Sequence, residues 1–515
     1  MSGTMMQDNS GGPPHRAAFH NLGCKVNSYE LDVMVQELRK AGWEIVPFEE
    51  PAEVYIVNTC TVTGVADRKS RQMLHRAKHT NPDALVVAAG CYVETDRAGL
   101  EEDPLVDLCI GNAQKADIVR ILQEITRGPG ASGEGPGMSS PGETAGPDGR
   151  RPADCSRAAD GPALRDDESS RRTGTAPQLT APGRTRADIK IQDGCSMYCT
   201  YCIIPYARGK LNSRDPEDVV REVRALEQSG VKEVVLTGIH ISSYGKEWVR
   251  RKTDGTGEQK AACEAAAAMP LREGTADPGR ELLQLLIRLQ MIAGLRRIRL
   301  GSLEPRIITE EFVRGLSRLS KVCPHFHLSL QSGCDATLRR MNRRYTVQEY
   351  RESVRILRAY YDRPAITTDI ITGFPGETPE EFEQTLAFAR EIGFYRIHVF
   401  KYSPRKGTPA VKFPGQCTDA EKTARSRALL ELTRVQAAAY RDSFLGEKEE
   451  ILLEDETLVQ GERYYAGHTM RYVEVLVPAR GHRSGELVSG TLVPGPEGAE
   501  CPVLQVQIVS GATNS

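Results

Sequence analysis

The most specific chemical signal in the sequence is a group of three closely spaced cysteines, Cys195, Cys199 and Cys202. Thiolates are the usual ligands of iron–sulfur clusters, and cysteines this close together in one loop can reach three corners of a cubic cluster. Zinc sites more often use paired C-x-x-C units or add histidine, and no fourth ligand lies nearby in the sequence. The spacing therefore favours a cluster with one open iron over a zinc loop or a chance grouping.

Three further cysteines, Cys24, Cys60 and Cys91, are far apart in the sequence but share one local setting. Each ends an apolar run with the character of a β-strand, namely AAFHNLGC, EVYIVNTC and ALVVAAGC. A single cysteine after a strand is more often structural than a ligand. In an open parallel sheet, however, the carboxyl ends of the strands share one edge, where ligands usually bind. We therefore expect these thiols to converge and to hold a second cluster without a fourth protein ligand.

Alternating strands and helices must position these cysteines. In the first segment, strand-like runs alternate with helical spacing, as in YELDVMVQELRKAG, and this order predicts a parallel sheet. The middle segment has six β-like runs, ADIKIQ, EVVLT, RIRLGS, HFHLSL, TTDIITG and YRIHVF, most of them separated by helical stretches. Six units are fewer than the eight of a complete barrel, so we predict a partial (β/α)6 barrel with functional residues at the carboxyl ends of its strands.

Composition changes along the chain predict a multidomain α/β protein. Residues 128–183 are rich in Gly, Pro, Ser, Asp and Arg and nearly lack large apolar side chains, so they cannot bury enough surface to fold. The last segment has short strand-like runs broken by glycines, which is typical of a small β-barrel. The predicted division is a disordered N-terminus at 1–16, a cluster domain at 17–127, a disordered linker at 128–183, a partial barrel at 184–442 with a surface insertion near 247–280, and an all-β domain at 443–510.

The bulk composition narrows the class of protein only loosely. The chain has 67 Lys and Arg residues against 69 Asp and Glu, so a nucleic-acid partner is neither indicated nor excluded. The polar start lacks the apolar core of a signal peptide, and no run reaches the length of a membrane span. We therefore expect a cytoplasmic protein without a membrane partner. In that reducing compartment its 13 cysteines need a reason other than disulfides.

With its strand context, the Cys195–Cys202 loop resembles the signature of the radical S-adenosylmethionine (SAM) superfamily. The open iron of such a cluster can hold the amino and carboxylate groups of SAM and place its sulfonium for one-electron cleavage. Tyr201 matches the aromatic position that flanks the adenine, and Gly238 follows the second strand, where the family contacts the methionyl amino group. The run DIITGFPGE at 369–377 matches the adenine-side loop. The resemblance implies that the cofactor-binding residues are Tyr201, Gly238, Glu304, Gly373, Pro375 and Gly376.

Residues 17–127 and 184–510 together resemble the methylthiotransferase family. Its architecture is an amino-terminal cluster domain, a radical SAM barrel and a small TRAM domain. The runs LGCKVN at 22–27, TGIH at 237–240, IIPYARGK at 203–210, SLEP at 302–305 and FKYS at 400–403 look most like the branch that modifies N6-threonylcarbamoyladenosine in tRNA. The linker and the insertion depart from the family pattern but remove no motif residue.

The resemblance implies a reaction on adenosine 37 of tRNA and a set of cofactors and partners. Two 4Fe-4S clusters are expected, at Cys24, Cys60 and Cys91 and at Cys195, Cys199 and Cys202, together with SAM. One SAM methylates a sulfur at the first cluster; a second is cleaved to a 5′-deoxyadenosyl radical, and the methylthio group enters at C-2 of the adenine. The expected partners are the tRNA anticodon stem-loop, a reductant such as flavodoxin or ferredoxin, and a sulfur donor. We expect a monomer.

Three alternatives remain open from the sequence. The same chemistry could act on isopentenyladenosine in tRNA or on an aspartate of a ribosomal protein. A different class is an iron–sulfur protein that binds RNA or transfers electrons without a reaction of its own. Formation of 5′-deoxyadenosine from SAM would distinguish an enzyme from that class.

RNA contacts are indicated only weakly by the sequence. Arg208, Lys210 and Arg214 could meet phosphates near the active site, or they could form a solvated or cofactor-facing turn. In the last segment basic and aromatic residues interleave, as in a small RNA-binding barrel or in the ordinary alternation of strands; they are Arg463, Tyr464, Tyr465, His468, Arg471 and Tyr472.

Several other chemically capable residues lack a functional pattern. We expect at most one of His325 and His327 to face the barrel interior, and neither to be catalytic. Seven cysteines lack ligand spacing, and burial or chance explains them better; they are Cys109, Cys155, Cys263, Cys323, Cys334, Cys417 and Cys501.

Overall fold

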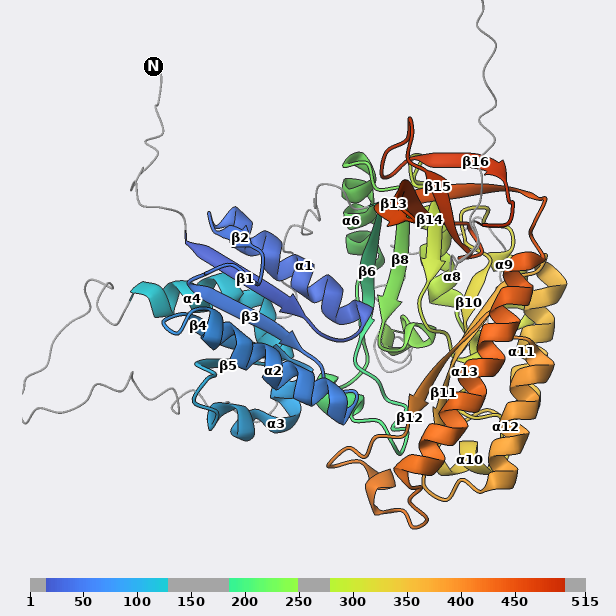
Figure 1. Cartoon of the computed structure of the whole chain (residues 1–515), viewed down its shortest axis with the longest axis horizontal. Helices are drawn as coiled ribbons and strands as arrows, with labels where there is room; N and C mark the ends of the chain where they lie inside the picture. The colour runs from blue at the N-terminus through green and yellow to red at the C-terminus, as the bar shows by residue number, and fades with distance from the viewer. Residues whose placement is uncertain (1–14, 128–184, 249–277, 496–515) are drawn as a thin grey trace, which may run out of the picture.

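The computed structural model describes residues 15–127, 185–248 and 278–495, which form three parts (Figure 1). The predicted linker at 128–183, nearly all of the predicted insertion and the end of the predicted all-β domain, residues 496–510, lie outside the described residues. Arg16, assigned above to the disordered N-terminus, is instead the first residue of a strand. None of the described helices is both long and apolar enough to cross a membrane.

The first part is a five-stranded, fully parallel sheet with the order β2-β1-β3-β4-β5. Its elements are β1 (Arg16–Asn21), α1 (Lys25–Lys40), β2 (Glu44–Val46), β3 (Val54–Thr59), α2 (Gly64–Thr80), β4 (Leu85–Gly90), α3 (Cys91–Glu101), β5 (Leu108–Ile110), the 3-10 helix η1 (Asn112–Asp117) and α4 (Ile118–Arg127). Alternate strand residues pack on α1 and α4 on one face and on α2 and α3 on the other. The strands are therefore buried on both sides, as near-continuous apolar runs require.

The second part is the predicted partial barrel, and all six predicted strands are present. They are β6 (Arg186–Asp193), β8 (Glu233–Gly238), β9 (Arg297–Leu300), β10 (His325–His327), β11 (Ala365–Thr372) and β12 (Arg396–Lys401). The sheets β7-β6-β8-β9 and β10-β11-β12 are joined by parallel bridges at Ile298–Val322 and Leu303–Leu328. The short strand β7 (Asn212–Ser213) pairs antiparallel with β6 and was not predicted.

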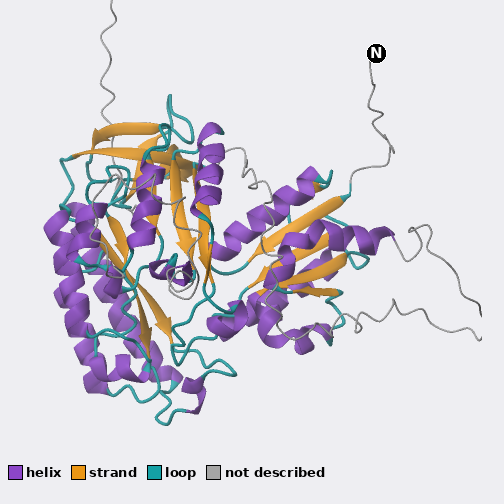
Figure 2. Cartoon of the chain, turned by 180° about the vertical axis from the view of Figure 1, so that it is seen from behind, coloured by secondary structure: helices purple, strands orange, loops and turns teal. Residues whose placement is uncertain are grey.

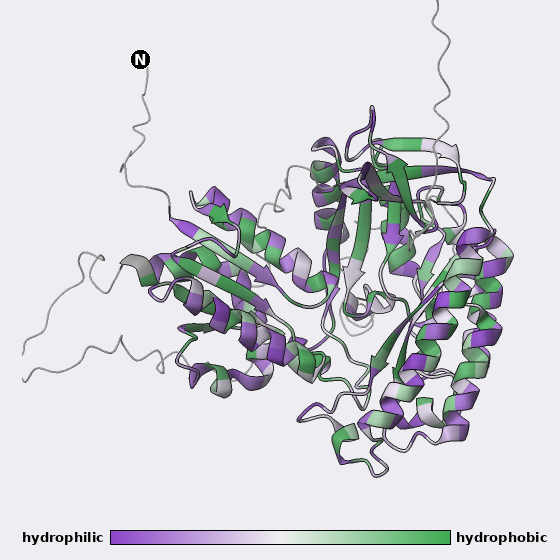
Figure 3. Ribbon diagram, viewed as in Figure 1, coloured by the Kyte–Doolittle hydropathy of each residue, from purple (hydrophilic) through white to green (hydrophobic). Residues whose placement is uncertain are grey.

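Helices cover the outer side of the barrel strands (Figure 2). The helices of this part are α5 (Ile204–Arg208), α6 (Pro216–Gln228), α8 (Arg280–Gln290), α9 (Glu310–Leu316), α10 (Asp335–Arg340), α11 (Val347–Tyr360), α12 (Pro379–Ile392) and α13 (Asp419–Asp442), with the 3-10 turns η4 (Ile241–Ser243), η6 (Pro305–Ile307) and η7 (Pro409–Lys412). Of these, α5 packs against α3 of the first part and does not cover the strands. The largest apolar core lies between these helices and the strands. The helices are apolar toward the strands and polar toward solvent (Figure 3).

The third part is an antiparallel sheet with the order β15-β14-β13-β16. Its strands are β13 (Lys448–Val459), β14 (Glu462–His468), β15 (Glu474–Pro478) and β16 (Leu487–Thr491). This sheet covers the amino ends of the barrel strands, where Tyr472 stacks on His325 with ring centroids 4.8 Å apart. Arg299 lies beside this contact, 4.6 Å from the Tyr472 ring, and its Nη1 is 3.4 Å from His325 Nδ1. The all-β character is as predicted, and the domain sits at the opposite end of the barrel from the cysteine loop.

The first part bridges the open side of the barrel, between β6 and β12. On the β6 side, Lys190 Nζ lies 2.8 Å from Glu30 Oε1 of α1. On the β12 side, Arg405 Nη2 lies 2.6 Å from Asp67 Oδ2 of α2. The Gly64 amide at the start of α2 also donates to Ser403 Oγ at 3.0 Å. The first part is thus fixed to the first strand of the barrel and to the segment that follows the last strand.

Candidate functional site

The first cysteine trio lies at the carboxyl edge of the first sheet. Cys24, Cys60 and Cys91 directly follow or closely follow β1, β3 and β4, which are adjacent parallel strands. Gly23 has a φ of +116°, and a Cβ there would lie 3.1 Å from Cys60 Sγ. This close approach explains a glycine before Cys24. The strand order places the three cysteines at one edge of the sheet.

The trio is electrostatically unfavourable for free thiolates. Burial, and then the neighbouring cysteines, raise the pKa of Cys60 to about 11. Burial also raises the pKa of Cys91, although Arg208 and Lys115 oppose the shift. Arg208 Nε of the barrel donates a hydrogen bond to Cys91 Sγ at 3.2 Å. Crowded thiols with a cationic donor beside them suit a bound metal cluster, whose positive charge stabilises thiolates.

The second trio lies in the loop that follows β6. Gly194 begins this loop with a φ of +67°, and no side chain would fit there because a Cβ would lie against the Lys210 carbonyl. The Cys202 amide donates to the Cys199 carbonyl at 3.0 Å, which folds the loop back on itself. Burial, followed by the Cys199 thiol, raises the pKa of Cys202 to about 12. The loop therefore places Cys199 and Cys202 on one tight turn, with the Cys199 thiol acting on Cys202.

Arg343 is a functional candidate that the sequence did not indicate. Its Nη1 donates to Cys199 Sγ at 3.3 Å, and its Nε donates to Tyr345 Oη at 3.0 Å. Tyr345 is buried and donates in turn to the Ser329 and Leu330 carbonyls. Each cysteine trio thus has one arginine that hydrogen-bonds a sulfur. No local motif marks Arg343, because it reaches the cysteine loop from a segment 144 residues away.

Two predicted cofactor-binding segments meet beside the second trio. The Tyr201 ring packs edge-on against Phe374, with centroids 6.3 Å apart, in the run that contains Gly373, Pro375 and Gly376. Gly373 and Gly376 have φ values of +69° and +76°, which favour glycine. The run is also a turn into α12, because the Gly373 amide donates to Glu377 Oε2 at 2.7 Å. The predicted adenine-side contacts are therefore close to the cysteine loop.

Gly238 lies at the end of β8, where only glycine fits. A Cβ there would lie 2.8 Å from the Gln192 carbonyl and 2.9 Å from Ile241. The buried Gln192 accepts a hydrogen bond from the His240 amide through Oε1 at 2.6 Å. Gln192 was not predicted as a site residue. The sequence feature that could have indicated it is its position on the inward-facing side of β6. It connects the end of β6 to the turn after Gly238.

Glu304 is buried and only partly satisfied. Its amide donates to Ser242 Oγ at 2.8 Å, but within the described residues its Oε1 has no hydrogen-bond partner. His240 Nε2, 3.7 Å from Glu304 Oε2, is likewise buried without a hydrogen bond in that part of the chain. Burial, aided by Lys246 and Arg343, lowers the pKa of His240 to about 3, so this imidazole is neutral at pH 7. Glu304 also acts electrostatically on Cys195.

These observations fit the cofactors that the sequence implies. Each trio offers three thiol ligands and one arginine donor, and the unpaired polar atoms of Glu304 and His240 could receive the polar end of an amino acid. Across residues 15–127, 185–248 and 278–495, no three His, Cys, Asp or Glu side chains converge as closely as a single metal ion needs.

Two sequence-based interpretations are corrected by the structure. Arg208 and Arg214 do not form a solvated turn, because Arg208 binds Glu30 and Asp193 and Arg214 binds Glu222. Arg208 therefore joins the barrel to α1, and Arg214 pairs with α6. Neither guanidinium is free to bind a phosphate.

The expectation that only one of two histidines faces inward is also wrong. His325 Nε2 and His327 Nδ1 both lie within 3.3 Å of Thr367 Oγ1 on β11. Residues two apart in a strand share a face, so both point to the barrel interior.

Comparison with known proteins agrees with this geometry. Residues 189–389 match the Radical SAM superfamily, and residues 16–111 match "Uncharacterized protein family UPF0004". The barrel and its cysteine loop thus define a radical SAM enzyme. In the solved radical SAM methyltransferase TsrM from Kitasatospora setae, 77% of that chain aligns with 78% of this one, at 16% identity and a TM-score of 0.46.

Curated relatives narrow the class. The chain is 34% identical to threonylcarbamoyladenosine tRNA methylthiotransferase MtaB from Bacillus subtilis, over 92% of each chain. It is also 34% identical to MtaB from Aquifex aeolicus, over 89% of this chain and 98% of the relative. A tRNA-2-methylthio-N(6)-dimethylallyladenosine synthase from Moorella thermoacetica is 32% identical, over 90% and 93%. The chain belongs to the radical SAM methylthiotransferase family.

Proposed function

We propose that this methylthiotransferase converts N6-threonylcarbamoyladenosine at position 37 of tRNA to its 2-methylthio derivative, using SAM and two 4Fe-4S clusters. The observation that carries the proposal is the contact of Arg208 with Cys91 across the two parts. It joins the edge that bears the first cysteine trio to the barrel segment just after the second trio. The substrate branch is supported by the relatives named MtaB.

The residues have distinct roles in this proposal. Cys24, Cys60 and Cys91 would hold one cluster, and Cys195, Cys199 and Cys202 the other. Bound SAM at the second cluster supplies the radical chemistry, and Tyr201, Gly238, Glu304, Gly373, Pro375 and Gly376 would form its binding site. The chain itself positions the base between the trios and excludes water from it.

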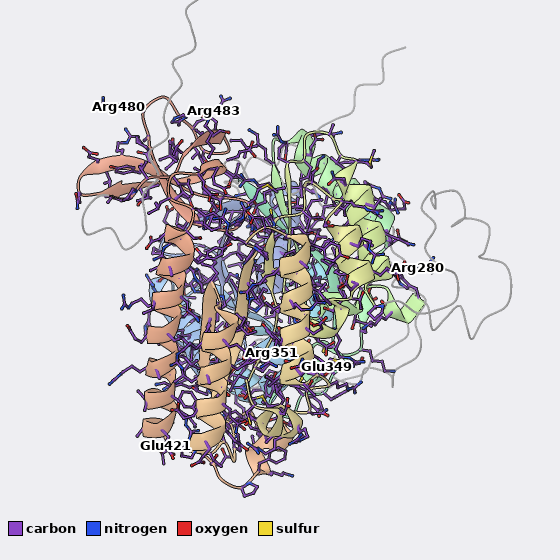
Figure 4. The ribbon with its side chains drawn as sticks, turned by 90° about the vertical axis from the view of Figure 1, so that its right-hand side faces the viewer. Arg280, Glu349, Arg351, Glu421, Arg480 and Arg483 are labelled. Atoms are coloured by element: carbon purple, nitrogen blue, oxygen red, sulfur yellow. The ribbon has the colours of Figure 1, made fainter. Side chains whose placement is uncertain are left out.

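The remaining partners belong to the proposal as well. The antiparallel sheet at 448–491 would act as a TRAM-like RNA-binding domain, and its loop carries the exposed residues Arg480 and Arg483 (Figure 4). The anticodon stem-loop is the proposed tRNA element. A reductant such as flavodoxin or ferredoxin and a separate sulfur donor would complete the reaction in the cytoplasm, with the enzyme acting as a monomer.

Iron content tests the two-cluster part of the proposal. Reconstituted wild-type protein should hold about eight irons, from two four-iron cubes. Replacing Cys24, Cys60 and Cys91 together by alanine should leave about four, and so should the same change at the barrel trio. The Cys417→Ala variant is the control and should keep the wild-type count. A wild-type content of about four irons would contradict the proposed cluster at Cys24, Cys60 and Cys91.

The substrate part is tested by the product nucleoside. The holoenzyme, SAM and a reductant are incubated with tRNA that carries N6-threonylcarbamoyladenosine, and the digested nucleosides are analysed by mass spectrometry. The expected product is the 2-methylthio derivative. The relative from Moorella thermoacetica makes dimethylallyladenosine tRNA the second candidate. Product only from that tRNA would contradict the proposed branch.

A further inference from the structure

Several exposed apolar side chains lie close in the sequence to the two cysteine trios. In the part of the chain that the structure describes, eleven large apolar side chains are exposed, and four of them lie within five residues of a trio cysteine; these four are Val62, Val65, Tyr198 and Tyr206. Single exposed apolar side chains are ordinary, but a group of them beside a reactive site indicates a contact surface. The two tyrosines are the aromatic members of this group, and they are 50% and 57% exposed.

Tyr198 and Tyr206 form one aromatic pair. Their ring centroids are 6.1 Å apart and their planes meet at 74°, which is an edge-to-face arrangement. Such a contact covers only one face of one ring, so the pair keeps other ring faces open to a partner. The other tyrosine of the cysteine loop, Tyr201, packs instead against Phe374 on the predicted cofactor side. The pair is therefore separate from the ring that is predicted to flank the adenine of SAM.

The backbone of Tyr198 has an uncommon conformation. Its φ is +49°, a value that residues with a side chain rarely adopt. Asn342, in the segment after α10, donates a hydrogen bond from Nδ2 to the Tyr198 carbonyl at 3.0 Å. This contact fixes the backbone from which the exposed ring projects. Such conformations persist only where the surrounding structure holds them, and they are concentrated at functional sites.

Contacts of the neighbouring residues place the pair between the two cysteine trios. Tyr198 is part of the loop that carries the second trio. Tyr206 belongs to α5, and the next residue, Ala207, accepts a hydrogen bond from Asn112 Nδ2 at 2.9 Å. The same Asn112 Nδ2 lies 3.7 Å from Cys91 Sγ of the first trio. One ring thus belongs to the second trio and the other adjoins the first.

The proposed reaction determines which partner suits this pair. A base that reacts inside a protein must leave the stack, so its neighbours in the strand lose a stacking partner. Exposed aromatic rings replace that partner for single-stranded bases and do so without a strong sequence preference. Lys210, four residues after Tyr206, is exposed, and none of the ion pairs among the described residues includes it. Its ammonium is therefore available to a phosphate of the same strand.

We propose that Tyr198 and Tyr206 form a stacking platform for the nucleotide next to the reacting adenosine in the anticodon loop. This proposal rests on the proposed function, because it takes the RNA of that reaction as the partner. The two rings take no part in the radical chemistry. They hold the strand beside the reacting base, so they contribute to RNA affinity and to the position of the loop over the two trios.

A fluorescent base next to the target adenosine tests the stacking platform. Two anticodon stem-loop RNAs carry 2-aminopurine on one side or the other of the adenosine, and each is titrated with reconstituted holoenzyme. Stacking quenches 2-aminopurine, so with one of the two RNAs the complex of the Tyr198→Ala or Tyr206→Ala variant should be brighter than the wild-type complex. Each alanine variant should also bind RNA roughly 10-fold more weakly. Tyr198→Phe and Tyr206→Phe keep the ring and should stay close to wild type.

Controls separate stacking from damage to the cysteine loop. Each variant must keep the wild-type iron content and absorption spectrum, and if Tyr198→Ala loses iron, the result for Tyr206→Ala decides. Leu430→Ala, at a half-exposed position on α13, is the matched control and should leave RNA affinity unchanged.

Three results would count against the stacking platform. Unchanged affinity and fluorescence for Tyr206→Ala would overturn it and leave the proposed function intact. Slower reduction of the variant by reduced flavodoxin, with RNA binding unchanged, would assign the pair to a protein partner. A wild-type enzyme that cleaves SAM but neither binds nor modifies these stem-loops would overturn the proposed function as well.

Discussion

At the scale of single residues, one cysteine of each trio accepts a hydrogen bond from an arginine side chain. Arg208 contacts Cys91 from the barrel, and Arg343 contacts Cys199 from the loop after α10. Hydrogen bonds to ligand sulfurs and burial are the main means by which proteins tune cluster potentials. Arg208 also binds Glu30, Asn27 and Asp193, so one side chain both orients a thiol and holds two domains together.

Glu30 makes a pH-dependent contribution to stability. Burial opposes its charge, but Lys115, Lys190 and Arg208 together hold the pKa of this carboxyl well below its ordinary 4.5. A lowered folded-state pKa stabilises the fold above the ordinary value, and the stabilisation is lost as pH falls through the lowered pKa. Glu30→Gln should therefore cost about 3 kcal/mol at pH 7, because Lys115, Lys190 and Arg208 each lose a carboxylate and only the last two keep Asp193.

Chemical denaturation at pH 7 and at successively lower pH measures this effect. The difference in unfolding free energy between wild type and Glu30→Gln should shrink as the pH drops below about 4.5. The exposed Glu431→Gln, whose partner Arg434 lies one turn away, is the control and should show a small difference throughout. A pH-independent gap for Glu30→Gln would contradict this assignment of its charge.

At this scale, short-range patterns were predictable and long-range contacts were not. The spacing of Cys195, Cys199 and Cys202 and the strand-end positions of the other trio are visible in the sequence. Arg343 could not be found, because its contact with Cys199 depends on how α10 packs under the loop. Arg208 was visible as a basic residue, but only the position of Glu30 on another domain shows that it is already paired.

At the scale of single elements, four helices of the barrel domain begin with a threonine N-cap. Thr309, Thr346, Thr378 and Thr418 each accept a hydrogen bond from the first turn of the following helix. The cap at Thr378 directly follows the Gly373–Glu377 turn. Its Oγ1 accepts from the Glu381 amide at 3.2 Å, and Glu381 Oε2 accepts from the Thr378 amide at 3.3 Å.

Thr378→Ala should lower the free energy of unfolding by about 1 kcal/mol, because the orphan amide loses its acceptor. Thr378→Ser keeps the hydroxyl and should stay close to wild type. Urea denaturation of the three proteins measures the loss. If the alanine variant also loses SAM affinity and the serine variant does not, the cap holds the Gly373–Glu377 turn in its binding shape; equal stability of all three would contradict the capping role.

The six barrel strands could be predicted because each carries a run of apolar residues between helical stretches. Among the strands that were not predicted, β2, β5 and β7 have only three, three and two residues. Such short segments hold no periodicity, and they pair only because a neighbouring strand presents free backbone groups. Closure of the barrel by the first domain was also beyond the sequence, since it depends on contacts between distant surfaces.

At the scale of the whole molecule, one basic surface is formed by side chains of α2. They line a shallow depression formed by Arg68, Arg71, Gln72, His75, Arg76 and His79. Lys69 and Arg71 are exposed, and α2 begins four residues after Cys60. Because Arg208 and Arg214 are used inside the protein, we expect the basic face of α2, close in the sequence to Cys60, to contact RNA instead.

Replacing Lys69 and Arg71 by serine should weaken tRNA binding at moderate salt without changing iron content. The slope of log affinity against log salt should fall by about one unit for each phosphate contact removed. Arg221→Ser on α6, where Arg221 pairs with Asp218, is the matched control. Binding titrations at several salt concentrations measure the slopes, and an unchanged slope for the double variant would exclude α2 from the RNA surface.

The stacking of Tyr472 on His325 fixes the antiparallel sheet to the amino ends of the barrel strands, while the cysteine loop begins at the carboxyl end of β6. The length of the barrel strands therefore sets the distance between the antiparallel sheet and the cysteine loop. β6 has eight residues, so the separation along the strand is about 25 Å. An RNA that contacts both the antiparallel sheet and the cysteine loop must extend beyond the loop that carries the reacting base. A fragment that contains only this loop would keep its contact near the cysteines but would not reach the antiparallel sheet.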